Sequence, residues 1–474
     1  MNTLPRLKPR CFYDIVVEVA LVRPGSIQGH AVNPYLRRRA GREPVTYLHP
    51  LLEPVLRQTL GVPLFQEQLM RIATDAAGLS GARADQLRRA MGAKRSPERM
   101  EALKGELMAG MEERGIDTLT RERIFDQLKA FADFGFPESH SFSFAHIVYA
   151  SAWLKVHAPE HFYAAILSSQ PMGFYSSATL VQDARRHGVT VLGPSVNDSF
   201  LDTGVQCAPG VPGEQEYREG RPDPLPSRQV IPLDVDEELV VRIGLSSVRG
   251  LGRAAERIVR VRETGAFSSQ ADLANRAHLS ASDMECLAMA GALECLGVGR
   301  REGTWAAGAL AAPTARQGEW QPFLPGTEVG TLVPDLPPLT RTEQMRADIE
   351  ATGLTPGEHP FSYLRGDLSP GVLRAAELGA HLDGRIVDVA GLVTHRQRPH
   401  TGGGVTFLSL EDESGFVNVS VAVGTWNKFR RIGLESGALL VRGTLEWGDG
   451  AVNVRAFRLA PVRLPIQVRS RDFR

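Results

Sequence analysis

The chain has 474 residues, and its 54 Lys and Arg are balanced by 54 Asp and Glu. That length predicts about three domains, and 43% apolar with 23% charged residues is a globular composition that excludes a largely disordered chain. Four scattered cysteines exclude a disulfide framework or a Cys-based zinc site, and the most apolar N-terminal run contains Glu18, which excludes a signal peptide or membrane span. We therefore expect a soluble cytoplasmic protein.

The neutral total conceals an uneven distribution of charge. Residues 1–100 carry 16 Lys and Arg against 8 Asp and Glu, whereas residues 201–240 carry 3 against 9. All but six of the basic residues are arginine, whose planar guanidinium suits phosphate. The basic block can attract a polyanion although the whole chain is neutral.

The first 195 residues have a helical pattern, in which apolar residues recur three and four positions apart. The predicted helices lie within residues 47–91, with a break at Gly61-Val62-Pro63, and then at 97–110, 120–134 and 145–155.

Two stretches rich in small residues and proline, 208–232 and 301–340, predict linkers on either side of a compact helical unit at about 240–300. From residue 381 the apolar period changes to two, which predicts strands. Five strands with one helical break favour a small closed β-barrel of the oligonucleotide-binding (OB) type, and a sandwich is the alternative. The predicted strands are 386–393, 405–410, 416–421, 439–445 and 451–457, with the break at 426–432.

The segment 247–258 contains Gly250-Leu251-Gly252, a tight turn at a predicted helix start. Free N–H groups at such a start suit a phosphate. A weaker second copy follows at 287–293. A single Gly-x-Gly is more often only a turn, but two copies beside a candidate OB barrel favour a helix-hairpin-helix pair that contacts the DNA backbone without reading bases.

A cluster of cations surrounds the end of the helix near residue 90. Arg88, Arg89, Lys94 and Arg95 could bind a triphosphate through bidentate hydrogen bonds, and a solvated basic face is the alternative. His140 stands among aromatic residues where a loop meets a helix start. That position suits polar recognition, and a turn packed by aromatics is the alternative.

The sequence predicts no metal site. His157 and His161 flank Pro159, which indicates a helix boundary. Asp234 and Asp236 stand in the acidic stretch and are predicted to be solvated. The acidic residues 411–413 are predicted, by the same reasoning, to form a solvated strand turn.

Several of these stretches together resemble the bacterial C-family DNA polymerases, the family of the DNA polymerase III alpha subunit. Residues 167–175 and 470–474 look more like the damage-inducible, error-prone branch. The segments similar to the family's fingers are 20–25, 65–68, 87–92, 134–136, 139–141 and 153–155.

The resemblance implies a multidomain α+β protein in the domain order of the family. The implied domains are the end of the palm and the helical fingers (1–195), an acidic linker (196–239), tandem helix-hairpin-helix motifs (240–300), a linker with a small helical connection (301–380) and an OB-fold domain (381–465).

The resemblance also implies roles for individual residues. The incoming deoxynucleotide would be bound by Arg88, Arg89, Lys94 and His140. DNA would be held by Arg23, Arg249, Gly250, Gly252 and Arg253, and by Trp447 in the barrel, with Phe407 and Phe416 as further stacking residues or barrel core. Glu138 stands where replicative relatives tend to have lysine, which argues against a phosphate contact there.

By this resemblance the chain is the C-terminal part of an error-prone, DNA-directed DNA polymerase that acts in translesion synthesis and DNA repair. Mg²⁺ would serve the complete enzyme, but no catalytic or metal-binding residue is expected here, because the palm carboxylates precede the matched segment in the family. The implied partners are primer–template DNA, deoxynucleotide triphosphates, an N-terminal polymerase half, other damage-response proteins and a sliding clamp, for which residues 317–323 are a faint candidate. The alternative is a non-catalytic DNA-binding accessory subunit or a truncated remnant.

Overall fold

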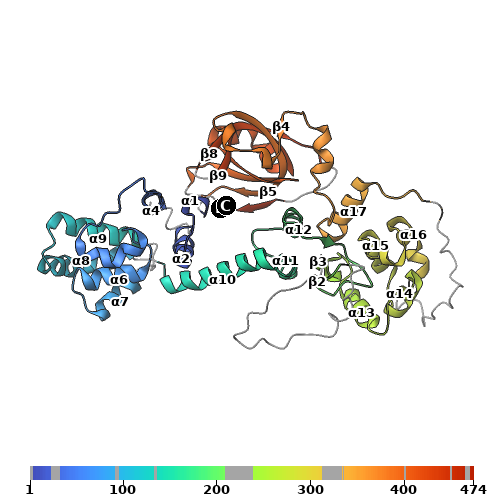
Figure 1. Ribbon diagram of the computed structural model, residues 1–474, viewed down its shortest axis with the longest axis horizontal. Coiled ribbons are helices and arrows are strands. Elements are labelled where there is room, and N and C mark those ends of the chain that lie inside the picture. The colour runs from blue at the N-terminus through green and yellow to red at the C-terminus, as the bar shows by residue number, and fades with distance from the viewer. Residues whose placement is uncertain are drawn as a thin grey trace. The chain divides into compact units, whose positions relative to one another are not determined.

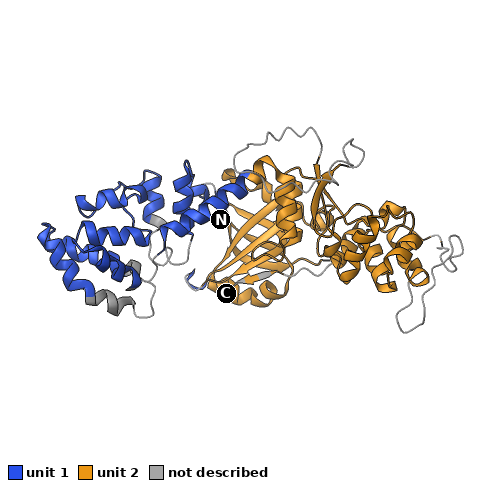
Figure 2. Ribbon diagram, turned by 90° about the horizontal axis from the view of Figure 1, so that it is seen from below, with its two compact units in different colours: residues 1–153, 400–404, 447–452 blue, residues 154–399, 405–446, 453–474 orange. Residues whose placement is uncertain are grey.

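The computed structural model describes residues 4–22, 32–90, 96–132, 136–208, 239–311, 334, 336–399, 402–448, 451–464 and 470–473 (Figure 1). The chain divides into two compact units (Figure 2). The first comprises residues 1–153 with 400–404 and 447–452, and the second comprises 154–399, 405–446 and 453–474. No helix within the described ranges is long and apolar enough to cross a membrane.

The first unit is built from helices with one apolar face. In α6, Leu69, Ile72 and Ala73 are buried at helical spacing, and they share a core with Leu87 of α7 and Leu128 of α9. The predicted helices at 97–110 and 120–134 are confirmed as α8 and α9. The helices are α1 (Leu4–Leu7), α2 (Phe12–Leu21), α4 (Val32–Arg39), η1 (Pro50–Leu52), α5 (Glu53–Leu56), η2 (Arg57–Thr59), α6 (Gln66–Asp75), α7 (Gly81–Ala90), α8 (Ser96–Glu113), α9 (Thr118–Ala132) and α10 (Glu138–His157).

Helix α10 begins seven residues earlier than the predicted start at 145. The backbone N–H of Glu138 donates to the Glu67 carboxylate at 2.8 Å, which caps the helix start. The buried Ser141 hydroxyl donates to the Val16 carbonyl and fixes the first turn on α2. His140 therefore lies inside the first turn of α10, and the aromatic-rich segment is helical from Glu138 onward.

The second unit starts with the end of α10, two further helices and a small sheet. Helix α10 ends at His157 and Pro159 opens α11, so the predicted helix boundary between the two histidines is confirmed. Strand β2 lies inside the predicted linker 196–239 and pairs antiparallel with β3. The sheet order is β1-β3-β2. The elements are α11 (Pro159–Ser168), α12 (Ser177–Arg186), β1 (Val191–Leu192), β2 (Gly204–Cys207) and β3 (Leu239–Arg242).

A second helical group follows the sheet and surrounds its own core. This core buries Leu251 of the first hairpin turn together with residues of four successive helices, Ile258, Leu273, Leu287 and Ala307. The predicted linker at 301–340 is helical up to Leu310. The elements are η4 (Leu245–Ser247), α13 (Arg253–Arg262), α14 (Gln270–Ala277), α15 (Ala281–Met289), η5 (Glu294–Leu296), α16 (Arg300–Leu310) and α17 (Arg341–Thr352).

The C-terminal strands close into a barrel in the order β5-β6-β7-β9-β8, with β8 pairing back to β5. Strand β5 pairs with both β6 and β8, because a bulge between Val393 and His395 bends it. Closure excludes the sandwich alternative, and α18 fills the predicted helical break. The elements are η6 (Ser362–Asp367), β4 (Val372–Leu373), η7 (Ala375–Glu377), η8 (Ala380–Leu382), β5 (Ile386–Gln397), β6 (Thr406–Asp412), β7 (Gly415–Val421), α18 (Val423–Glu435), β8 (Ala438–Gly448), β9 (Ala451–Pro461) and β10 (Arg471–Phe473).

Candidate nucleic-acid interface

The first hairpin turn exposes its backbone at the start of α13. Gly250 has φ of +85° and Gly252 has φ of +48°, conformations that side-chain-bearing residues rarely adopt. Leu251 between them is buried, so both glycines are held at the surface. A Cβ at Gly252 would meet no atom within 4 Å. A phosphate can therefore approach this backbone closely.

The second hairpin turn, between α15 and α16, is more crowded. Gly291 has φ of +74°, as the repeated glycine pattern predicts. A Cβ there would lie 2.8 Å from Nη2 of Arg300 and 2.9 Å from Oε1 of Glu294. Side chains of this chain therefore cover the second turn, and the first is the more open to a ligand.

Two arginines flank the first turn, and their surroundings differ. The Arg249 guanidinium donates to the carbonyls of Ile349 and Glu350, at 3.3 and 3.2 Å, where α17 ends. The Arg253 side chain is exposed and makes no hydrogen bond or ion pair with another residue in the described ranges. Of the two predicted DNA contacts, Arg253 therefore has the cation available to a phosphate, whereas Arg249 joins the hairpin to α17.

One row of the barrel surface combines an aromatic ring with a cation. The strand registers place Gln397, Phe407, Ser420 and Arg455 side by side across β5, β6, β7 and β9. Phe407 is 42% exposed, and its neighbours along β6, Thr406 and Leu408, are buried in the barrel. The row therefore points outward, where Phe407 can stack on a base and Arg455 can neutralise a phosphate of a single nucleic-acid strand.

The other two aromatic candidates of the barrel have different surroundings. Phe416 is half-buried and lies under the Arg186 guanidinium, 5.3 Å from ring centroid to Cζ. Trp447 is 37% exposed and lies in strand β8, two residues beyond the predicted strand 439–445.

The arginines of α7 share one carboxylate. Asp85 accepts from Nε and Nη2 of Arg88 at 3.0 and 2.8 Å, and lies 2.8 Å from Nε of Arg89. The hydrogen bond from Arg88 is the main cause that lowers the pKa of Asp85. Both guanidinium groups are exposed, because Ala84 and Leu87 turn the opposite face of the helix into the core. The structure thus brings these two cations together.

His140, on α10, is exposed between two aromatic rings. The ring of Phe136 lies 5.3 Å away and that of Phe144 lies 4.7 Å away, both edge-on. Glu138, the first residue of α10, accepts a hydrogen bond from the Tyr13 hydroxyl at 2.6 Å. Its carboxylate is therefore part of the internal packing of the first unit.

Some predicted positions lie outside the described residues: Arg23, Lys94, Arg95, Asp234, Asp236 and 317–323. In the ranges that are described, no group of three or more His, Cys, Asp or Glu side chains is placed to hold a metal ion.

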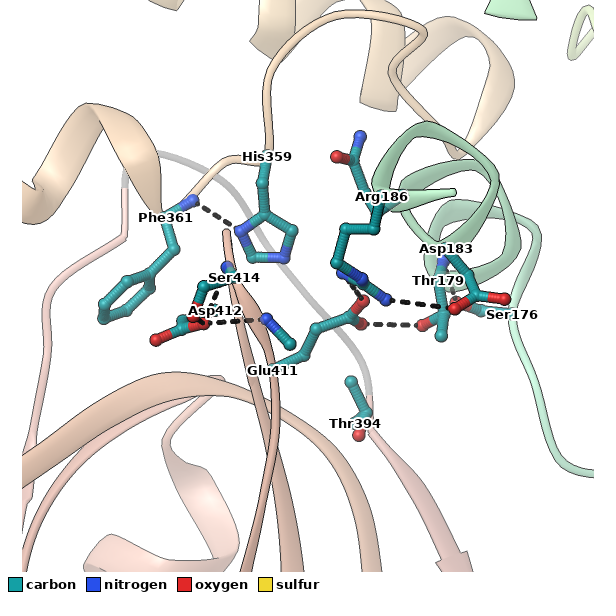
Figure 3. A network of polar contacts seen from close by, with 12 residues as sticks. Ser176, Thr179, Asp183, Arg186, His359, Phe361, Thr394, Glu411, Asp412 and Ser414 are labelled. Carbon is teal, nitrogen blue, oxygen red and sulfur yellow. Dashed lines mark hydrogen bonds and ion pairs between the residues drawn. The ribbon is translucent and has the colours of Figure 1, made fainter. Parts of the chain in front are cut away.

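The acidic turn at 411–413 corrects a prediction. Glu411 and Asp412 are only 2% and 1% exposed, so the solvated reading was wrong, although the strand turn is present. Glu411 pairs with Arg186 of α12 (Figure 3). Asp412 pairs with Arg365 of η6. Sequence reasoning missed this cluster, because its partners are more than 40 residues away and no local pattern marks them.

Comparison with known proteins gives two matching family models. Residues 1–115 match the bacterial DNA polymerase III alpha subunit finger domain, and residues 188–303 match a helix-hairpin-helix motif. The second match contains both hairpin turns.

Curated relatives match the chain from end to end. It is 50% identical over 478 residues to the error-prone DNA polymerase of Mycobacterium bovis, covering 100% of this chain and 41% of that protein. The Mycobacterium tuberculosis enzyme is also 50% identical, over 100% of this chain and 40% of that protein, and the Nocardia farcinica enzyme is 49% identical, over 100% and 39%. The chain thus spans about two fifths of the length of these relatives.

Among solved structures, asparaginyl-tRNA synthetase from Pyrococcus horikoshii aligns at 23% identity over 21% of this chain and 24% of that chain, with a TM-score of 0.18. A score this low supports no inference about the present chain. The finger-domain match and the identity over the whole length agree with each other: the chain is a homologue of the C-terminal part of the error-prone DNA polymerases, and its first 115 residues match the finger domain of the bacterial DNA polymerase III alpha subunit.

Proposed function

We propose that this chain is the part of an error-prone DNA polymerase that holds primer–template DNA and the incoming deoxynucleotide during synthesis past damaged bases. The observation that carries this proposal is the 50% identity over the whole chain to an error-prone DNA polymerase. The complete enzyme would transfer a deoxynucleotide from its triphosphate to the primer 3′ hydroxyl and release pyrophosphate.

DNA would be held by two surfaces of the second unit. The open turn at Gly250 and Gly252, with the unpaired cation of Arg253, fits the phosphates of a duplex. The barrel row with Phe407 and Arg455 fits the bases and phosphates of single-stranded template. Backbone N–H groups contact phosphates rather than base edges, so the hairpin turn is expected to hold DNA of any sequence, which suits a polymerase.

The nucleotide would be held by α7 of the first unit. Arg88 and Arg89 are exposed and share Asp85, so a triphosphate would replace one carboxylate as their common partner. His140 is a further proposed contact. The donors present in the described ranges do not fit a pair of Mg²⁺ ions, so no catalytic step is assigned to this chain.

The proposal is tested by fluorescence anisotropy of a labelled primer–template with a single-stranded overhang, titrated with the full chain. We expect binding that weakens steeply with salt, because phosphate contacts release counterions. Phe407→Ala should weaken binding of the overhang substrate about tenfold, since stacking contributes about 1–3 kcal/mol per base. Ile386→Ala, another exposed apolar side chain of the same barrel, should change the affinity little.

No binding of the primer–template at low salt, or an affinity that salt does not change, would contradict the proposal. If Phe407→Ala and Ile386→Ala lower the affinity equally, the barrel row is not part of the DNA interface. Primer extension in Mg²⁺ by this chain alone would overturn the expectation that the catalytic carboxylates lie elsewhere.

A further inference from the structure

Barrel strand β6 is joined to α12 by a polar cluster that is almost completely buried (Figure 3). The barrel contributes Glu411 and Asp412, α12 contributes Thr179 and Arg186, and η6 contributes Arg365. Glu411 and Asp412 each have a carboxyl oxygen within 3.1 Å of a guanidinium nitrogen.

Glu411 is buried by another element and not by its own barrel. Leu408 and Leu410 point into the barrel, so strand alternation places Glu411 on the outer face. Its carboxylate accepts from the Thr179 hydroxyl at 3.0 Å and from Nη1 of Arg186 at 3.1 Å. An outward-facing carboxylate that is 2% exposed shows that α12 covers this part of the barrel closely.

A second pair anchors the segment that leads into the barrel. Nε of Arg365 donates to Glu413 at 2.8 Å and Nη2 donates to Asp412 at 3.0 Å. Asp412 also accepts from the backbone N–H of Ala375 at 2.9 Å. The turn between β6 and β7 is thus tied to η6 and η7 as well as to α12.

His359 lies in the same cluster as a neutral group. Its Nδ1 accepts from the backbone N–H of Phe361 at 3.1 Å, and the side chain is buried. Burial, with the charges of Arg186 and Arg365, lowers the pKa of His359 to about 3, so it adds no third cation to the cluster.

The contacts continue from α12 to the first hairpin. Gln182 of α12 donates to the carbonyls of Thr355 and Gly357, at 3.2 and 3.1 Å. These residues follow α17, whose last turn accepts from Arg249 beside the hairpin glycines. One chain of hydrogen bonds therefore connects the hairpin turn, α17, α12 and β6.

We propose that the cluster of Thr179, Arg186, Arg365, Glu411 and Asp412, here named the barrel latch, is a positioning device that fixes the barrel relative to the hairpins. Its role in synthesis rests on the proposed function: the latch would set where single-stranded template leaves the duplex that the hairpins hold. Buried ion pairs suit this task, because their geometry is directional and the loss of one partner leaves an uncompensated charge.

Charge reversal on one side of the latch tests the proposal. Glu411→Arg places a third guanidinium beside Arg186 and Arg365. We expect the amides of α12 and of the β6–β7 turn to exchange hydrogen at least about a hundredfold faster, the effect expected of a broken buried pair. Glu446→Arg makes the same charge change on an exposed side chain of β8 and should leave these rates unchanged.

Two further variants separate an opened latch from a misfolded barrel. Arg186→Glu breaks the same pair from the α12 side and should accelerate exchange in the same segments. The double variant Arg186→Glu with Glu411→Arg restores opposite charges and should exchange more slowly than either single variant. Exchange equal to wild type in both single variants, or no recovery in the double variant, would overturn the latch.

DNA binding separates the latch from the function on which its role rests. Wild type should bind a duplex with a single-stranded overhang more tightly than a blunt duplex. In Glu411→Arg, most of this difference in affinity should be lost, while the affinity for the blunt duplex should be unchanged. If a variant with fast hydrogen exchange still binds the overhang duplex more tightly than the blunt duplex, by as much as wild type does, the positioning role would be overturned. If wild type binds neither DNA, the proposed function fails, and the exchange rates still decide whether the latch exists.

Discussion

At the scale of single residues, charge in this chain has two different uses. Arginine is abundant, and many of its guanidinium groups bind the chain itself. Arg276 donates to the carbonyls of Val261, Ala266 and Gly265, and Arg262 to those of Val196 and Ser199. The planar guanidinium that suits phosphate equally suits the carbonyls at helix ends and loops. Composition alone therefore overstates how many arginines face a nucleic acid.

Glu411 gives a pH prediction at this scale. Desolvation raises its pKa from 4.5 to about 7, outweighing the attraction of Arg186 and the hydrogen bond from Thr179, while Asp183 raises it slightly further. The folded state binds this proton more tightly than the unfolded chain does. Its contribution to stability is therefore complete below about pH 4.5 and is lost as the pH rises through about 7.

Urea unfolding at a series of pH values measures this contribution. Between about pH 4.5 and about pH 8, the free energy of unfolding of wild type should fall by up to about 3 kcal/mol more than that of Glu411→Gln, which has no proton to lose. Parallel stability curves for the two proteins would contradict the raised pKa.

At the scale of elements, the hairpins form where glycine permits the turn. The two Gly-containing copies seen in the sequence are both present, and each carries a glycine with positive φ. Only the tertiary packing makes them unequal, because Arg300 and Glu294 crowd Gly291 while Gly252 faces open space. The first hairpin is therefore the one proposed to contact DNA.

A pair of glycine substitutions tests this hairpin geometry. Gly250→Ala should lower the free energy of unfolding by about 1–2 kcal/mol, because φ is +85° and the new Cβ would lie 2.9 Å from Sγ of Cys286. Gly308→Ala, in α16 with no atom within 4 Å of the new Cβ, should raise it by about 0.5–1 kcal/mol. Chemical denaturation of both variants gives the comparison, and equal effects would refute the strained turn.

At the scale of the whole molecule, the chain consists of two compact units with separate cores. The second unit holds the hairpins, the small sheet and most of the barrel, and the latch lies within it. Units with separate cores unfold with limited cooperativity between them.

Scanning calorimetry should therefore show more than one thermal transition. Glu411→Arg should shift a transition of the second unit to lower temperature and leave that of the first unit in place. A single transition that moves as a whole in the variant would show that the units unfold together.

The sequence by itself determined the elements whose signals are local. Apolar spacing predicted the helices of the first unit from residue 47 onward, alternation predicted the five barrel strands, and the glycines of 250–252 predicted a turn at the start of a helix. These features depend on residues only a few positions apart, so they can be predicted from the sequence alone. The same reading could predict the arginine pair of α7, because Asp85 lies within one helical turn of both.

Only the tertiary structure decided which side chains are covered. Glu411 is buried by Thr179, which lies 232 positions earlier, and Arg249 is held by carbonyls 100 positions later. The early start of α10 likewise depends on Glu67, 71 positions away. Burial and ion pairing arise from elements that folding brings together, so no pattern at short spacing distinguishes the buried Glu411 from a solvated acidic turn.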